Sequence, residues 1–386
     1  MVTGSAEPLP FSEAEFADRL AVVQQRLRAD ALQGALLFDP ENIFWLTGFQ
    51  TIGYFTFNCL FVPAAGKPVL ISRTVNRHLA RETPTLQGFV AIDDDAVPTE
   101  VLAVHLAAAV PAGAPVGAET GAWYLTVRDH RDLQARVAVR LVDWNGFIEQ
   151  QRLIKTPAQL ERMRWAARAA EAGLDAALRA IAPGKTENDL AAAMFAATIS
   201  AGSEYLGHPP LVVAGERTAL CFAMWRRRVL RVGDVVLLEA AGCIDRYHAM
   251  IARSAVLGPA SPAQRDAAAT IIGMLEAAIG AMRPGVRCSE VYAACRAVAE
   301  AAGLAGYFDH RAAYGIGLGF PPNWSEGKII SIRAGETAVL RPGMAFHVVP
   351  TLFMPEFGMC FSESVVVTES GCEVLNDYPR RLFEVA

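Results

Sequence analysis

The chain has 386 residues, of which 53% are hydrophobic and 19% charged, with a formal net charge of −5. This length allows two domains with substantial cores, and the composition is globular. The negative charge argues against a nucleic-acid-binding protein. No apolar run long enough to span a membrane and no signal peptide is found, so we expect no membrane association. Seven scattered cysteines predict reduced, mostly buried thiols and a cytoplasmic protein.

Residues 1–152 alternate helical and strand patterns, which predicts a small α/β domain. Apolar residues at helical spacing predict a helix over 11–30, and an Ala-rich run predicts another over 100–110. Short apolar runs predict strands at 35–38, 59–63, 68–71 and 137–142. The runs at 59–63 and 68–71 flank a turn and predict a hairpin.

Residues 153–386 contain two similar stretches. Helical patterns over 158–182 and 267–282 each stop at Pro-Gly, and each is followed by an Ala-rich helix, over 187–201 and 289–302. These matching stops favour an internal duplication, although Ala-rich helices could match by composition alone. Apolar strands follow each pair, at 235–238, 251–257, 345–349 and 364–368. Two αα-ββ halves would bury one curved sheet under paired helices, an α+β arrangement.

Two C-terminal segments carry a family resemblance. Residues 313–326, with Gly-Ile-Gly, and 342–350, with Pro-Gly-Met, resemble the motifs of the pita-bread family, which includes methionine aminopeptidase, prolidase, creatinase and ectoine hydrolase. Residues 42–49 and 153–157 are similar to further elements of that family, so the resemblance covers nearly the whole chain. It implies a creatinase-like N-terminal α/β domain over 1–152 and a pita-bread α+β domain over 153–386.

The resemblance also locates five ligand positions. The peptidases of the family bind two metal ions there, through carboxylates and a histidine suited to such ions. In this chain the five positions are Glu239, Met250, Tyr314, Val349 and Ser362. One acidic residue cannot build a dinuclear site, so we expect no metal ion and no other cofactor.

Creatinase and ectoine hydrolase are the metal-free branch, and they hydrolyse C–N bonds in small polar nitrogen compounds. The segment 319–326 and the Pro-Arg-Arg-Leu-Phe segment at 379–383 look most like ectoine hydrolase. One departure is Phe222, which stands beside Cys221 where those hydrolases keep a histidine. Cys221 could be a nucleophile, but a buried, inert thiol is the favoured interpretation.

Two carboxylates and a histidine are the predicted catalytic residues. Glu239 and Glu363 lie in predicted central strands, where an ionised carboxylate is costly unless it is paired or functional. They could act as general acid and base, or bind a cationic amidinium. The alternative is an ion pair with an arginine such as Arg253. His248 could replace the missing base, or it could be a strand histidine facing solvent or a backbone carbonyl.

Further residues are predicted to bind substrate. Tyr314 occupies a ligand position, so its hydroxyl should enter the site. Trp324 and Phe320 could form an aromatic wall for a cation, or simply pack in the core. Glu326 could meet a substrate amine, or be a surface loop charge; Arg226–Arg228 could bind a carboxylate, but a solvated turn is favoured for at least two of them. The full predicted set is Tyr314, Tyr247, His347, His208, Phe222, Trp324, Phe320, Arg253 and Glu326.

We therefore expect a metal-independent hydrolase acting on a C–N bond of a small cyclic amidine, guanidino or amide compound. The alternatives are a cyclase, lyase or isomerase on the same fold, and a catalytically inactive binding protein; the ligand positions disfavour a metallopeptidase. The resemblance also implies a homodimer in which the N-terminal domain covers the partner's active site, through Phe44, Trp45, Phe49 and Tyr54.

Overall fold

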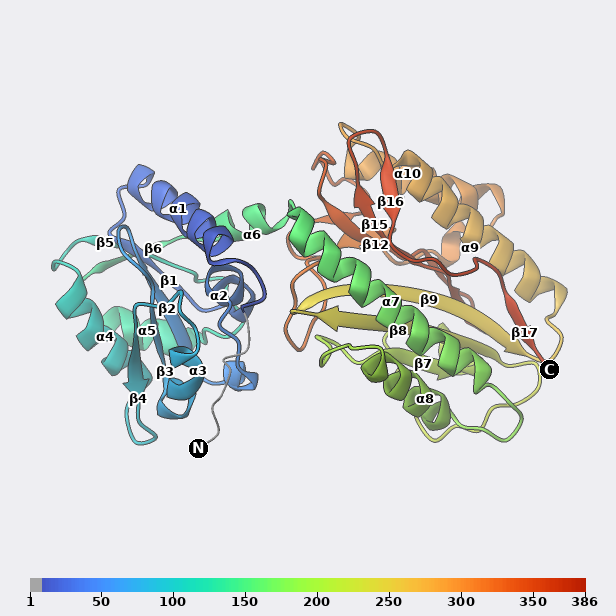
Figure 1. The fold of residues 1–386 in the computed structure, drawn as a ribbon. Helices are drawn as coiled ribbons and strands as arrows, with labels where there is room; N and C mark the ends of the chain where they lie inside the picture. Colours follow the sequence, from blue (N-terminus) through green and yellow to red (C-terminus); the bar gives the residue numbers. More distant parts are fainter. Residues whose placement is uncertain (1–8) are drawn as a thin grey trace. The chain divides into compact units, whose positions relative to one another are not determined.

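The structure, a computed structural model, describes residues 9–386 and forms two compact units (Figure 1). Unit 1 ends at Gln151 and unit 2 begins at Arg152, one residue before the domain boundary predicted from the sequence. Within residues 9–386, no helix combines the length and the apolar character that crossing a membrane requires.

Unit 1 is built on a six-stranded sheet in the order β4-β3-β2-β1-β5-β6. Its strands are β1 (Gly34–Leu37), β2 (Asn58–Pro63), β3 (Val69–Arg73), β4 (Gly88–Ile92), β5 (Pro115–Ala118) and β6 (Arg140–Asp143). The β1–β2 and β2–β3 pairs are antiparallel and the other neighbours are parallel. The predicted hairpin is therefore confirmed as β2–β3.

Helices accompany this sheet: α1 (Glu13–Ala29), α2 (Pro40–Thr47), α3 (Arg77–Arg81), α4 (Pro98–Ala109), α5 (Val127–Arg136) and α6 (Phe147–Arg152). The helices predicted over 11–30 and 100–110 are confirmed as α1 and α4. The strand predicted over 137–142 starts later, because Val137 is the C-terminal cap of α5 and its N–H donates to the Leu133 carbonyl. Leu102 and Leu106 of α4 belong to the same buried apolar core as Leu36 and Phe61 of the sheet.

Unit 2 contains two helix pairs, as predicted: α7 (Pro157–Arg179) with α8 (Glu187–Ser200), and α9 (Pro262–Ala281) with α10 (Cys288–Ala301). Thr156 starts α7 and Ser261 starts α9, each with a capping box and a proline at the first turn. Gly184 and Gly285 follow the first helix of each pair with φ of 81° and 86°, a left-handed conformation that favours glycine. The two halves thus share their helix starts and their turns.

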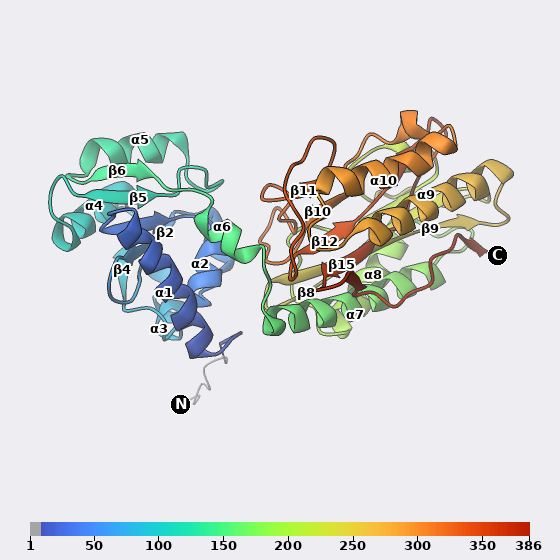
Figure 2. The same ribbon diagram turned by 90° about the horizontal axis from the view of Figure 1, so that it is seen from above.

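The strands of unit 2 form two larger sheets and a small one. A four-stranded sheet has the order β17-β9-β8-β7, a five-stranded sheet has the order β11-β10-β12-β15-β16, and β13 pairs with β14. The strands are β7 (Leu211–Ala214), β8 (Val235–Ile244), β9 (Tyr247–Leu257), β10 (Ala313–Gly315), β11 (Ser331–Ile332), β12 (Ala345–Val348), β13 (Thr351–Phe353), β14 (Gly358–Cys360), β15 (Glu363–Val367), β16 (Cys372–Val374) and β17 (Phe383–Val385). In Figure 2 the strands β8, β12 and β15 lie between the α9–α10 pair and the α7–α8 pair.

The sequence predicted one curved sheet, and the structure differs at the junction of β9 with β15. Two serine hydroxyls stand between these strands, beside a backbone hydrogen bond of 3.1 Å from the Ser362 N–H to the Ala252 carbonyl oxygen. The Ala252 N–H donates to Ser362 Oγ at 2.7 Å, and the Met250 N–H donates to Ser364 Oγ at 2.8 Å. Side-chain oxygens therefore satisfy backbone donors where the two sheets meet.

Each sheet has one face on a helix pair and one face toward the other sheet. Leu238 and Ala240 of β8 belong to the apolar core under α7 and α8, while Phe346 and Val348 of β12 belong to the core under α9 and α10. Because side chains alternate along a strand, the residue between each pair points to the opposite face. The remaining face of each sheet is therefore where polar residues of unit 2 can meet.

Candidate active site

Glu239 lies between Leu238 and Ala240 on β8, so its carboxyl group projects away from the α7–α8 core. The residue is 7% exposed, and burial raises its pKa to about 7. Among the described residues its carboxyl group has no hydrogen-bond partner; His347 Nδ1 lies 3.7 Å from its Oε1. A carboxyl group with a pKa near neutrality and free oxygens can exchange protons at physiological pH.

A chain of side-chain hydrogen bonds lies beside Glu239. The Ser362 hydroxyl is 2.6 Å from His347 Nε2, and the Tyr314 hydroxyl is 2.8 Å from His347 Nδ1. Trp324 Nε1 donates to the Tyr314 hydroxyl at 3.2 Å. Tyr314 on β10 is directly opposite His347 on β12, and Ser362 immediately precedes β15, so three neighbouring strands supply the chain.

Burial shifts the pKa values of these groups. Desolvation, with smaller contributions from His310 and Arg311, lowers the pKa of His347 to about 3. Desolvation and then Glu239 raise the pKa of Tyr314 well above its usual value. His347 is therefore neutral, and Tyr314 keeps its proton, throughout the physiological range.

His208 joins this group through an aromatic contact. Its ring centroid lies 4.8 Å from that of Trp324, and its Nδ1 lies 2.5 Å from the Pro209 carbonyl oxygen. Burial lowers the pKa of His208, so it too favours the neutral form. Of the predicted site residues, the structure thus brings together Glu239, Tyr314, His347, Trp324 and His208.

Glu363 does not lie with Glu239. Its Oε1 accepts from Arg253 Nη2 at 2.7 Å and from Arg380 Nε at 2.8 Å. Arg253 is opposite Leu238 on β8, so it occupies the other face of the hairpin from Glu239. The ion pair with Arg253, the alternative to catalysis for Glu363, is therefore what the structure contains.

His248 shares the face of Glu239 but not its surroundings. It is opposite Cys243, four residues along β8 from Glu239, or about 13 Å by strand rise. Its Nε2 accepts from the Gly207 N–H at 2.9 Å and its Nδ1 lies 3.0 Å from the Arg246 carbonyl oxygen. Both nitrogens thus have backbone partners, and the neighbouring Tyr247 points to the opposite face.

Two further predicted residues contribute to packing within unit 2. Phe320 is buried, with the Arg246 guanidinium 4.9 Å from its ring centroid. Glu326 is 2% exposed; its carboxylate binds Lys155 Nζ and accepts from Arg152 Nη2 at 3.0 Å. The interpretation of Glu326 as a surface charge is therefore wrong, because it forms a buried ion-pair cluster.

The segment 221–228 is more exposed than expected. Phe222 is 71% exposed with φ of 61°. Cys221 is exposed, so its interpretation as a buried thiol is wrong; five of the remaining cysteines are buried and Cys372 is half-buried. Arg226 and Arg227 are exposed, as expected for a solvated turn, whereas Arg228 pairs with Glu216 and Asp234.

The aromatic residues expected to reach a partner are largely internal to unit 1. Phe44, Trp45 and Phe49 are 0%, 6% and 4% exposed. Tyr54 is half-buried and packs edge-on against Phe55 and Tyr124. The first three therefore serve the core of unit 1 and are not available to another chain.

The residues around Glu239 do not fit a pair of divalent metal ions. Of the five ligand positions, Tyr314 and Ser362 bind His347, and Met250 and Val349 offer no oxygen or imidazole ligand. Within residues 9–386, the one close group of three metal-ligating side chains is Asp39, Glu119 and Glu149 in unit 1. There Glu119 accepts from the Phe38 and Asp39 N–H groups, which accounts for its burial.

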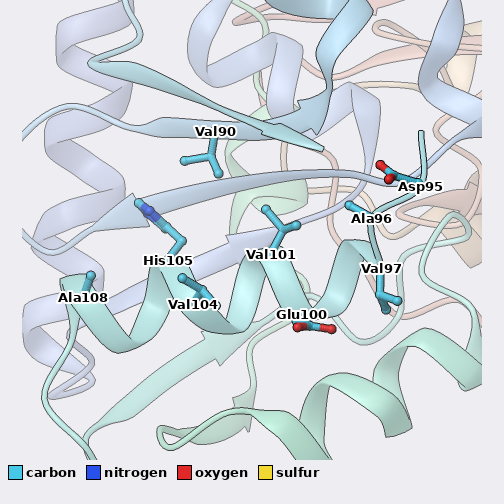
Figure 3. A pocket seen from close by; sticks show the side chains of 9 residues that line it. All are labelled: Val90, Asp95, Ala96, Val97, Glu100, Val101, Val104, His105 and Ala108. Carbon is cyan, nitrogen blue, oxygen red and sulfur yellow. The ribbon is translucent and has the colours of Figure 1, made fainter. Parts of the chain in front are cut away.

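Unit 1 also holds an open, largely apolar groove of about 620 Å³ beside α4 (Figure 3). Val90 of β4 lines it from one side and Val101 and His105 of α4 from the other. His105 Nε2 is buried there and has no hydrogen-bond partner among the described residues. None of the predicted site residues lines this groove.

Ser362 and Arg311 were not predicted as site residues. The sequence identifies Ser362 only as one of the five ligand positions. The structure adds Arg311, whose guanidinium lies 4.5 Å from the Tyr314 ring centroid. A signal for Ser362 was present, because Ser362 and Ser364 alternate with Phe361 and Glu363 and mark a polar strand face. Arg311 has no such signal in the sequence, because its contact with the Tyr314 ring depends on the path of the backbone over residues 311–314.

Two family models match the chain. Residues 161–369 match metallopeptidase family M24, and residues 19–154 match the creatinase/prolidase N-terminal domain. An uncharacterized hydrolase/peptidase of Sinorhizobium fredii is 32% identical over 97% of this chain and 98% of its own length. The ectoine hydrolase of Halomonas elongata is 29% identical, again over 97% and 98%.

Solved structures agree with these matches. The dipeptidase PepE of Mycobacterium ulcerans superposes with a TM-score of 0.83 and 26% identity, over 97% of this chain and 99% of its own. A prolidase of Thermococcus sibiricus superposes with a TM-score of 0.86 over 97% and 100%, and at 20% identity it is evidence for the fold alone.

Proposed function

Since this chain belongs to the hydrolases of metallopeptidase family M24 and has their pita-bread fold, we propose that it breaks a C–N bond of a small polar nitrogen compound without a metal ion. The observation that carries the proposal is the replacement of the metal-binding side chains around Glu239 by a neutral hydrogen-bonded chain. The similar protein of Halomonas elongata is named for the hydrolysis of ectoine, which favours a cyclic amidine over a peptide as substrate.

Glu239 is the proposed general base. Its ionised carboxylate takes a proton from a water molecule, whose oxygen forms a bond to the carbon of the C–N group. The C–N bond then breaks, and the carboxyl group of Glu239 returns the proton to the leaving nitrogen, so that water is added across the bond. A carboxyl pKa near 7 suits both steps, because proton uptake and release are then nearly balanced.

Tyr314 is the proposed donor to the substrate, and Trp324 and His208 form the wall beside it. Glu363, Arg253, His248, Tyr247, Phe320 and Glu326 have partners within the fold, so in this mechanism they support the site without touching substrate. Phe222 lies on the exposed segment 221–228, where it would contact substrate only at the rim.

The proposal is tested by measuring metal content together with turnover. We expect elemental analysis of the purified protein to find well below one metal ion per chain, and ectoine turnover to resist chelation. A Gly-Pro dipeptide serves as the comparison substrate, because dipeptidases are among the relatives. Stoichiometric metal, or dipeptide turnover that a chelator abolishes, would refute the metal-free C–N hydrolase.

We also propose that the protein is a homodimer, with unit 1 as the contributing surface. Phe55 at 72% and Trp123 at 65% exposure are next in sequence to Tyr54 and Tyr124, whose rings are in contact. Exposed apolar side chains gathered in this way mark interaction sites. We expect the protein to sediment as a dimer and the double variant F55D/W123D as a monomer. Val104→Asp is the matched control, since Val104 is 67% exposed on α4. A monomeric parent protein would contradict this proposal.

A further inference from the structure

The chain of side-chain hydrogen bonds through Ser362, His347 and Tyr314 has a direction: at each contact one group must donate and the other must accept. Trp324 Nε1 can only donate, so the Tyr314 oxygen accepts at that contact. The Ala252 N–H likewise donates to Ser362 Oγ. These two fixed donors stand at opposite ends of the chain, and they limit what the three groups between them can do.

Ser362 is the first group so constrained. Its oxygen accepts from Ala252, and within residues 9–386 the one acceptor in reach of its own hydrogen is His347 Nε2. If Nε2 carried a proton instead, it would donate to the second lone pair of the Ser362 oxygen, and the Ser362 hydrogen would be buried without an acceptor. Such a group costs about 1–3 kcal/mol. The serine therefore donates, and Nε2 accepts.

The accepting role of Nε2 determines which ring nitrogen of His347 carries the hydrogen. A neutral imidazole with an accepting Nε2 carries its hydrogen on Nδ1. That hydrogen faces the Tyr314 oxygen at 2.8 Å, so the tyrosine oxygen accepts from both His347 and Trp324. Its own hydrogen must then point elsewhere. Glu239, whose Oε1 lies 3.7 Å from the same Nδ1, is close by but forms no hydrogen bond with the tyrosine, so this hydrogen is available to a bound molecule.

We infer that Ser362 is a positioning residue which, through the Nδ1–H tautomer of His347, aims the Tyr314 hydroxyl at the substrate beside Glu239. Tyr314 is then the hydrogen-bond donor to the substrate atom that gains electron density when water adds. The inference rests on the proposed function for the presence of a substrate, but the tautomer and the direction of the chain do not depend on it.

The surroundings of Tyr314 strengthen its hydroxyl as a donor. A phenol oxygen that accepts two hydrogen bonds is polarised, and its O–H becomes a better donor. The Arg311 guanidinium over the ring favours negative charge on the phenol oxygen. A fixed donor in a buried site needs little reorganisation during the reaction, which is the condition for stabilising a transition state.

The first test is the tautomer of His347 in the full-length protein without substrate. Histidine labelled with ¹⁵N and ¹³C allows the protonated ring nitrogen to be identified by NMR, and the signal is assigned by its loss in His347→Gln. We expect hydrogen on Nδ1 and none on Nε2 from pH 6 to 8. A proton on Nε2 overturns the inference, whether or not the protein turns over ectoine.

The second test compares two buried serines of the same strand segment. Ser362→Ala removes the donor to Nε2, so we expect the Nε2–H tautomer to appear and kcat to fall about 100-fold with little change in KM. Ser362→Thr keeps the hydroxyl and should restore both. Ser364→Ala is the matched control, because Ser364 Oγ contacts only the Met250 backbone. Equal losses in Ser362→Ala and Ser364→Ala, with an unchanged His347 signal, would show a structural role alone and overturn the inference.

Discussion

Replacing Glu239 by glutamine should abolish turnover and, above neutral pH, make the protein more stable. A glutamine amide cannot take the proton of water, so the site loses its proposed general base and we expect kcat to fall at least about 10³-fold. The stability gain has a separate cause. An ionised carboxylate in this site is poorly solvated, whereas a glutamine amide of the same shape carries no charge.

The direction in which stability changes with pH follows from the raised pKa of Glu239. Burial raises the pKa of Glu239 from 4.5 to about 7, so between these values the folded protein holds a proton that the unfolded chain has released. Stability therefore falls as pH rises from 4.5 to 7, by roughly 3 kcal/mol in all, and stays low above 7. We expect Glu239→Gln to match the parent protein at pH 4.5 and to be about 2–3 kcal/mol more stable at pH 8.

Urea unfolding at pH 4.5 and pH 8 measures the stability difference between the variant and the parent protein. A pH–rate profile measures the ionisation of Glu239 through its effect on turnover. Turnover by the parent protein should rise with pH and level off above about pH 7, because the base must be ionised. Glu276→Gln, an exposed substitution on α9, is the control for the change of side chain. A Glu239→Gln protein that keeps its turnover, or that loses stability at pH 8, would rule out a desolvated catalytic carboxylate.

Replacing Arg253 by methionine should destabilise the protein by about 3–5 kcal/mol, because it leaves the Glu363 carboxylate buried with one partner fewer. Arg253 is fully buried and also donates to the carbonyl oxygens of Pro379 and Ser362. The Glu363 Oε2 atom already lacks a partner among the described residues. The double variant R253M/E363L should recover part of the loss, since it removes both buried charges.

Arg164→Met provides the comparison by urea unfolding. Arg164 pairs with Glu373 at 2.8 Å, but both side chains are 41% exposed, so we expect a cost of at most about 1 kcal/mol. Equal costs for Arg164→Met and Arg253→Met would contradict the buried ion pair. The folded R253M/E363L protein also separates structure from catalysis: near-normal turnover assigns Glu363 to the fold, and loss by orders of magnitude assigns it to the reaction.

The comparison of Glu239 with Glu363 shows what could be predicted from the sequence. Both were identified as carboxylates on central strands, because the apolar residues around them are a local signal. Whether they meet depends on the register of β8 with β9, which places Glu239 opposite Ala252 and Arg253 on the other face. Register is a property of strand pairs, and a single strand does not contain it.

The helices are predicted more accurately than the side-chain contacts, because helix signals are local in the sequence and most contacts are not. The beginning of α7 follows from Thr156 and Pro157, which act within one turn. The role of Glu326 depends on Lys155, which is 171 residues away in the chain. Such contacts exist only after both segments have reached their places, so a loop carboxylate could not be distinguished from a buried one.

The alternation of β12 also protects the protein against mispairing. His347 lies on the polar face, between Phe346 and Val348, which pack under α9 and α10. A shift of one residue along β15 would turn an imidazole into that apolar core and two large apolar side chains toward Glu239. Burying the imidazole and exposing the two apolar side chains to the polar site would both be costly. The residues that build the site therefore also disfavour any other alignment of β12 with β15.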